Sequence, residues 1–164
     1  MKRFFTCLLF AVLSAFFIMS GCTATENKVP AETVPEATQG SLPEESAALI
    51  TITVHGETFL ATLESTAAAG EFVKRLPLTL DMNELNGNEK YSYIDQPLPE
   101  TSSIPSLIRA GDLMLYGDNC LVLFYDRFKT EYSYTPIAHM EQADALADAL
   151  GEGNVSVTFA MKPA

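Results

Sequence analysis

The sequence predicts a mainly β domain between residues 49 and 164, in which eight strands close into a barrel accompanied by two α-helices. Three observations support this fold class. Side chains in residues 50–54 alternate between apolar and hydroxylated, which is the period of a half-buried strand. Residues 120–125 form a continuous apolar run after a tight turn, which indicates a strand buried on both faces, as in a closed barrel with a helix or loop outside. Two other segments space their apolar residues as helices do.

A β-hairpin and a helix open the domain. Residues 50–54 and 57–63 are the predicted arms of the hairpin, and a Gly-containing turn separates them. Ser65 or Thr66 then provides an N-cap for a helix, because a side-chain oxygen at this position accepts a bond from a free backbone N–H. Pro77 ends this helix, because proline has no N–H and its ring collides with the preceding turn.

The rest of the domain is predicted as six strands and a second helix. Asn86-Gly87 and Gly117-Asp118-Asn119 are turn signals, and the proline-containing stretch 96–108 is predicted as a loop. Residues 141–150 place apolar side chains on one side of a helix that Gly151 ends. The six strands are expected at residues 78–82, 90–94, 112–116, 120–125, 132–140 and 155–159.

The order of these elements resembles that of the cyclophilin barrel: a hairpin, a helix, several strands, a second helix and a final strand. The resemblance covers essentially all of residues 49–164 and implies an eight-stranded barrel whose two helices cap its ends. Short stretches also resemble bacterial cyclophilin-like domains. These stretches are ITV at 52–54, TFLATL at 58–63, LPL at 76–78, GNEKY at 87–91, GDLMLY at 111–116 and LFY at 123–125.

The resemblance raises prolyl isomerisation as one activity. In cyclophilins an arginine weakens the amide resonance of an X-Pro bond beside an apolar pocket, and the barrier to be lowered is about 18–20 kcal/mol. Their signature, a Phe–His–Arg run with spaced aromatic residues and a Trp, has no match here. Arg109 and Arg127 are the free arginine candidates. A weak peptidyl-prolyl isomerase is therefore the alternative to a non-catalytic module that binds a peptide, a protein or a small ligand; a purely structural partner domain is a third possibility.

Aromatic residues gather between Tyr116 and Tyr134 and predict a binding surface, since six of them fall within nineteen residues. Such a density can line a peptide or small-ligand groove. The same rings can instead pack in the core or at the barrel rim, and this is the role favoured for Phe124. Tyr132 and Tyr134 share one strand face by their spacing of two. The predicted ligand-binding residues are Phe124, Tyr125, Arg127, Phe128, Tyr132 and Tyr134.

The N-terminal 48 residues predict export and membrane anchoring. Residues 1–21 have a cationic start and an apolar stretch that is shorter than the roughly 20 residues needed to cross a bilayer, as in a signal peptide. Met19-Ser20-Gly21-Cys22 resembles the lipobox of bacterial lipoprotein precursors. This implies that Cys22 carries membrane lipid, and that the protein is anchored to the cell membrane and faces outside the cytoplasm. The alternative is an ordinary secretory signal with a chance cysteine. Residues 23–48 contain five Glu and three Pro and predict a disordered linker.

The charge of the chain makes nucleic-acid binding improbable. Cleavage before Cys22 would remove two of the 10 basic residues and none of the 21 acidic ones, so the mature net charge would be 8 − 21 = −13. A surface this acidic repels nucleic acid. Solubility alone accounts for the acidity, and no nucleic-acid partner is expected.

The reactive side chains lie apart from one another in the sequence, so we expect neither a metal site nor a bound cofactor. His55 and His139 do not belong to a cluster with the spacing of metal ligands. Phosphate-binding loops are absent from the sequence, and Cys120 in its apolar run is expected to be a small buried hydrophobe. Three acidic residues lie near one another but lack the spacing of a catalytic pair, so we expect solvated loop charges at Glu84, Glu89 and Asp95.

Overall fold

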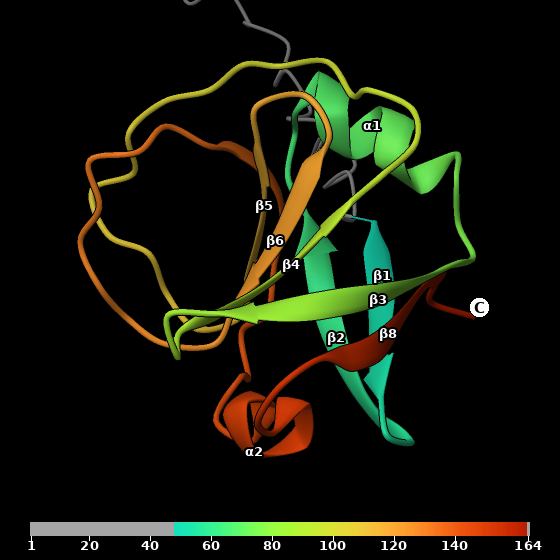
Figure 1. Ribbon diagram of the computed structural model, residues 1–164. Helices are drawn as coiled ribbons and strands as arrows, with labels where there is room; N and C mark the ends of the chain where they lie inside the picture. Colours follow the sequence, from blue (N-terminus) through green and yellow to red (C-terminus); the bar gives the residue numbers. More distant parts are fainter. Residues whose placement is uncertain (1–47, 164) are drawn as a thin grey trace, which may run out of the picture. The chain divides into compact units, whose positions relative to one another are not determined.

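The computed structural model describes residues 48–163, which form a closed antiparallel β-barrel of eight strands with two helices (Figure 1). The predicted fold class is therefore confirmed. The predicted signal peptide, Cys22 and the linker up to residue 47 lie outside the described residues. The elements are β1 Leu49–Val54, β2 Glu57–Leu63, α1 Ala67–Val73, β3 Leu78–Leu85, β4 Glu89–Tyr93, β5 Asp112–Tyr116, β6 Cys120–Phe124, β7 Thr135–His139, α2 Leu146–Leu150 and β8 Val155–Met161.

The strands follow one another around the barrel in the order β1-β2-β7-β5-β6-β4-β3-β8, and β8 pairs with β1 to close it. The two ends of the domain meet at this closure, where the backbone N–H of Lys162 donates to the carbonyl of Leu49 at 3.0 Å. Strand β6 stands four places from β1 in this cycle of eight, so the two strands form opposite walls of the barrel. Within residues 48–163, no helix is long and apolar enough to cross a membrane.

Local sequence signals form the turns and caps as predicted. Thr66 is the N-cap of α1, and its Oγ1 accepts from the backbone N–H of Ala69 at 3.1 Å. The same hydroxyl donates to the carbonyl of Pro136 at 2.8 Å, which ties α1 to β7. At the β3–β4 turn, Asn86 and Gly87 have φ angles of 57° and 73°. Asn and Gly tolerate this left-handed conformation, and the turn brings β4 back against β3.

Strand β6 is buried on both faces, as its continuous apolar run predicted. Because side chains alternate across a strand, Leu121 and Leu123 point into the barrel and join its main core. The outward side chains belong to a second hydrophobic cluster outside the barrel. This outer cluster consists of Ile108, Met114, Cys120, Val122, Phe124 and Tyr134.

Two long loops cover the outer face of β5 and β6. They lie on the same side of the barrel (Figure 1), and backbone bridges pair Ser103 with Tyr134 and Ile108 with Phe128. Each loop thereby satisfies part of the backbone hydrogen bonding of the other, and the bridges hold the two loops together. The loops build a second layer on the barrel, and their edge next to β4 is where the candidate site lies.

Two elements are shorter than predicted. The strand expected at 132–140 is limited to β7, because the backbone of Tyr134 pairs with Ser103 of the covering loop. The helix expected at 141–150 is limited to α2, whose N-cap residue, Ala145, makes no side-chain capping bond. Without a cap, the first free N–H groups of a longer helix would lack partners.

Candidate functional site

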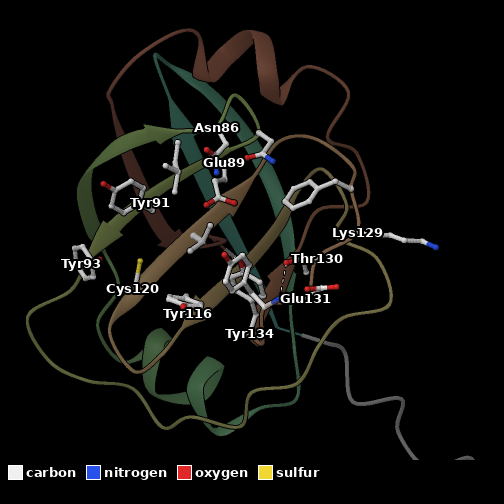
Figure 2. Close-up of a pocket in the computed structure, with 15 residues that line it drawn as sticks. Asn86, Glu89, Tyr91, Tyr93, Tyr116, Cys120, Lys129, Thr130, Glu131 and Tyr134 are labelled. Carbon is white, nitrogen blue, oxygen red and sulfur yellow. Dashed lines mark hydrogen bonds between the residues drawn. The ribbon is translucent and has the colours of Figure 1, made fainter.

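A cleft of about 800 Å³ opens on the outer face of β4 and β6, next to the covering loop that follows β6 (Figure 2). This volume lies within the range of sites for small molecules and short peptide segments. Five of the six tyrosines of the chain line it, and we call it the tyrosine cleft. These residues are Tyr91, Tyr93, Tyr116, Tyr132 and Tyr134.

The β3–β4 hairpin positions Glu89 at the end of the tyrosine cleft. Glu89 is the first residue of β4, and the alternation of side chains along a strand places Tyr91 and Tyr93 on the same outer face. Lys90 points to the opposite face and is fully buried. One strand therefore carries adjacent charges of opposite sign to two separate environments.

The Glu89 side chain is mostly buried, but its carboxylate oxygens keep contact with the cleft and pair with none of the described residues. The side chain is 8% exposed, and no hydrogen bond or ion pair to it is present among residues 48–163. Burial raises the pKa of Glu89 above its usual range, and the negative charge of Glu84 raises it further. The prediction that Glu89 is a solvated loop charge is wrong. The period-two series Glu89, Tyr91, Tyr93 was the sequence signal that could have placed it beside the aromatic residues.

Glu89 also influences its neighbours in the tyrosine cleft. Burial, together with the negative charge of Glu89, raises the pKa of Tyr134 to about 12. The same two causes raise the pKa of the Cys120 thiol. Both groups therefore stay neutral near pH 7, and Glu89 and Glu131 are the acidic groups that line the cleft.

Aromatic rings form the walls of the tyrosine cleft through edge-on contacts. The centroids of Tyr91 and Tyr93 are 6.0 Å apart with nearly perpendicular planes, and Tyr116 and Tyr132 meet in the same way at 6.1 Å. Such T-shaped pairs place the positive edge of one ring against the negative face of the other. Tyr93 and Tyr132 are 65% and 63% exposed, so the rim of the cleft remains available to a ligand.

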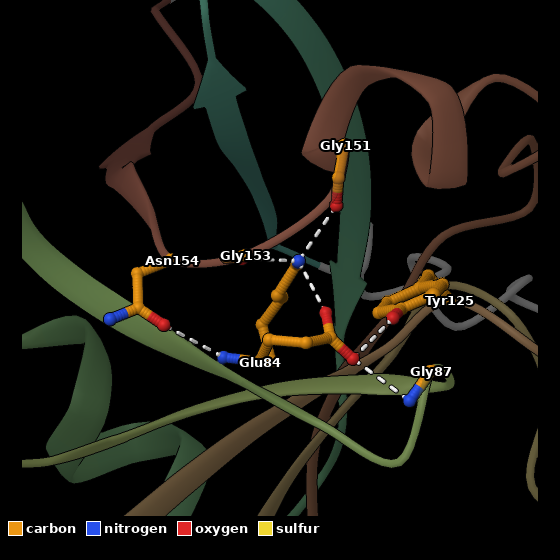
Figure 3. Close-up of polar contacts among 7 residues, drawn as sticks. Glu84, Gly87, Tyr125, Gly151, Gly153 and Asn154 are labelled. Atoms are coloured by element: carbon orange, nitrogen blue, oxygen red, sulfur yellow. Dashed lines mark hydrogen bonds and ion pairs between the residues drawn. The ribbon is translucent and has the colours of Figure 1, made fainter.

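Glu84, in contrast, belongs to a network in which each charge has partners (Figure 3). Its carboxylate forms an ion pair with Lys90 and accepts from the Tyr125 hydroxyl at 2.7 Å and from the Gly87 N–H at 2.9 Å. Although burial raises the pKa of Glu84, these hydrogen bonds outweigh it and hold the pKa below its usual value. Lys90 also donates to two carbonyls after α2, those of Gly151 and Gly153, at 2.8 and 2.7 Å.

The predicted ligand-binding residues fall into three environments. Phe128, Tyr132 and Tyr134 line the tyrosine cleft. Phe124 lies beneath it, fully buried, with ring centroids 5.6 Å from Phe128 and 5.4 Å from Tyr134.

The other two predicted residues lie apart from the tyrosine cleft. Tyr125 points to the Glu84 network, where the Lys90 ammonium is 5.4 Å from its ring centroid. Arg127 is exposed and outside the cleft lining. Ligand binding by any of the six residues stays a prediction.

Neither a metal-ligating cluster nor an arginine is found among the described residues around the tyrosine cleft. Within the part of the chain that the structure describes, no three His, Cys, Asp or Glu side chains come together as they would around a metal ion. Among the described residues that line the cleft, Lys129 is the one cation and no arginine is present. His139 pairs with Asp112 at 2.6 Å between β7 and β5, outside the cleft lining.

Comparisons with known proteins identify a family. The model of the cyclophilin-like family matches residues 52–160. A comparison with curated proteins gave no match. Among solved structures, the solution structure of a hypothetical protein from Archaeoglobus fulgidus is 13% identical, with a TM-score of 0.49 over 71% of this chain and 95% of that one.

Proposed function

This chain belongs to the cyclophilin-like family, and from that premise we propose that it is a lipid-anchored, extracytoplasmic binding module whose ligand site is the tyrosine cleft. The observation that carries the binding role is the Glu89 carboxylate, whose side chain is mostly buried among aromatic walls and which pairs with none of the described residues. A protein interior normally pairs such a group, because an unpaired buried charge costs free energy. A cleft that combines a perturbed acid with aromatic surface is the expected form of a ligand site.

The lipid anchor rests on the similarity of residues 19–22 to a lipobox and on the signal-like stretch before them. Two or more acyl chains give stable membrane attachment, whereas a single chain gives marginal attachment. Residues 23–48 would then act as the spacer between the membrane and the barrel, and as a coil of about 26 residues they would span roughly 30 Å.

The binding role is tested by presenting the full-length chain, in a non-ionic detergent, to an immobilised tetrapeptide array. We expect the parent to bind a subset of peptides, and Tyr93→Ala and Tyr132→Ala to weaken that binding, since both side chains are exposed at the cleft rim. Leu60→Ala is the matched control, because Leu60 is an exposed apolar residue on β2, outside the cleft. Equal losses in the three variants would place the binding surface elsewhere.

The anchoring is tested by comparing Cys22→Ser with Cys120→Ser in a bacterial host fed an alkyne-tagged fatty acid. The parent and Cys120→Ser should be labelled and should sediment with membranes. Cys22→Ser should lose the label, because the acylated thiol is gone. Label retained in Cys22→Ser would contradict the proposed anchor.

A further inference from the structure

We propose that the group recognised in the tyrosine cleft is an organic cation, an alkylammonium or a guanidinium, paired with Glu89 and enclosed by tyrosine rings. The inference rests on the proposed function, because it names the chemistry of the ligand at the same site. Such a group is carried by a basic side chain of a peptide or by a free amine.

The unpaired polar groups of the tyrosine cleft are hydrogen-bond acceptors, so a matching ligand would supply donors. Glu89 is more than nine-tenths buried, and among residues 48–163 no donor reaches it. Asn88 Oδ1 is also buried without a hydrogen bond, and Asn88 lines the same cleft. Ammonium and guanidinium groups carry several N–H donors and no acceptor, so they suit a lining whose unpaired polar atoms are acceptors.

The aromatic residues favour a cation that is organic. The face of a tyrosine ring is negative and attracts ammonium or guanidinium groups, and clusters of such rings bind alkylated ammonium ions. Five tyrosines and Phe128 line the cleft. A metal ion would need several oxygen, nitrogen or sulfur ligands, and the described residues hold no cluster of three suitable side chains. The surroundings therefore suit a cation that is weakly hydrated and partly apolar.

The charges around the tyrosine cleft have the sign that attracts a cation. Figure 2 shows Glu89 within the cleft, whereas Lys129 extends away from it. Glu131 adds a second acidic group to the lining. Residues 48–163 contain 7 basic and 16 acidic side chains, a net charge of 7 − 16 = −9, so the long-range field also draws cations to the domain.

The test uses N-acetyl-arginine amide and its neutral isostere N-acetyl-citrulline amide, added to the full-length chain in a non-ionic detergent. Tyrosine fluorescence is a direct readout, because the chain has no Trp and five of its six Tyr line the cleft. We expect saturable binding of the arginine derivative and at least about tenfold weaker binding of citrulline. Glu89→Gln should weaken arginine binding by a similar factor. Glu57→Gln, which removes the same charge from an exposed site on β2, should leave it unchanged.

Butylammonium in a parallel titration separates the two sources of the cation. Binding as tight as that of the arginine derivative assigns a free amine, and much weaker binding assigns a peptide side chain. Both results support a cation site.

Three outcomes would contradict the cation site, and one of them would also contradict the proposed binding role of the cleft. If citrulline binds as well as arginine and Tyr132→Ala weakens both, the cation inference fails while the cleft remains a ligand site. If Glu89→Gln keeps the arginine affinity and its urea titration shows a cooperatively folded protein, Glu89 is not the counter-ion and the inference again fails. If no probe binds and the tetrapeptide array is also blank, the proposed function falls with it.

Discussion

Glu84 and Glu89 belong to the same β-hairpin, yet their surroundings have little in common. Glu84 is one quarter exposed and meets Lys90, Tyr125 and the Gly87 N–H. Glu89 is buried more deeply and meets no donor among residues 48–163. The pKa of Glu84 is lowered and that of Glu89 is raised.

The difference separates a carboxylate that holds the fold from one that is available to a ligand. The Glu84–Lys90 pair joins the β3–β4 hairpin to the segment after α2, because Lys90 also binds the carbonyls of Gly151 and Gly153. Glu89 pairs with none of the described residues, and its burial costs free energy that a partner would recover. The lack of a partner among the described residues, rather than burial or charge alone, is therefore the reason that Glu89 and not Glu84 is the proposed ligand contact.

The largest effect on stability is expected for Glu84→Ala, which removes the carboxylate from its network. This change leaves the fully buried Lys90 ammonium without its counter-ion, and we expect a loss of about 3–5 kcal/mol in the free energy of unfolding. Urea denaturation followed by circular dichroism measures it. A loss below about 1 kcal/mol would mean that the pair behaves like an exposed surface ion pair.

Glu89→Gln should raise the free energy of unfolding, by less than Glu84→Ala lowers it. Replacing an unpartnered buried carboxylate by a neutral amide of the same shape removes a desolvation cost, and we expect a gain of about 1 kcal/mol at pH 7. The same urea titration measures it. A marked destabilisation would show that the carboxylate has a structural partner after all.

The pH dependence of stability sharpens the contrast. Glu84 has a folded pKa below 4.5, so its stabilising contribution is present above pH 4.5 and is lost as the pH falls. Glu89 has a folded pKa above 4.5, so its penalty is absent below pH 4.5 and grows as the pH rises through the folded pKa. Urea midpoints should thus show the cost of Glu84→Gln shrinking in acid, and the gain of Glu89→Gln growing toward neutral pH. Parallel curves for the two variants would contradict the assignment.

The high pKa of Tyr134 allows a spectroscopic test of whether the Glu89 charge acts on its neighbours in the cleft, and the expected effect is smaller than those above. Ultraviolet titration of phenolate should contain a component with a midpoint of about 12, which Tyr134→Phe removes. In Glu89→Gln this component should shift to lower pH, because part of the rise comes from the Glu89 charge. An unchanged midpoint would place Glu89 too far from Tyr134 to affect it.

The smallest effect is expected in prolyl isomerisation. No arginine is among the described residues that line the tyrosine cleft, and Arg127 lies outside that lining. We therefore expect exchange NMR on an X-Pro peptide to show an unchanged isomerisation rate. Line broadening at a catalytic protein concentration would reverse this expectation and support the isomerase alternative.

Local patterns in the sequence were sufficient to predict most of the barrel. The Thr66 cap, the Asn86-Gly87 turn and the two-sided burial of β6 each depend on a few neighbouring residues. The same patterns could not place Glu89. Glu89 shares the cleft with residues 128–131 of the loop after β6. The covering loops are held by backbone bridges between residues 20 to 31 positions apart, Ile108 with Phe128 and Ser103 with Tyr134.

The aromatic residues near the cleft show the same limit. Phe124, Phe128 and Tyr134 are close in sequence and in space, but the strand alternation and the loop path decide how deeply each of them is buried. Tyr91 and Tyr93 come from a different part of the chain, and the β4–β6 pairing brings them to the site. The aromatic-rich stretch 116–134 therefore contains four of the six aromatic residues of the lining, and the predicted ligand-binding set contains three of them.

The opposition of β1 and β6 in the barrel has a practical consequence. The chain enters the domain at Leu49, on the wall across from the strand beneath the tyrosine cleft. An affinity tag or a sensor chip attached upstream of this residue is therefore joined to the domain on the wall opposite the tyrosine cleft. An attachment chemistry that targets Lys129 would obstruct the rim of the cleft, so immobilised binding measurements should be made through the N-terminal side.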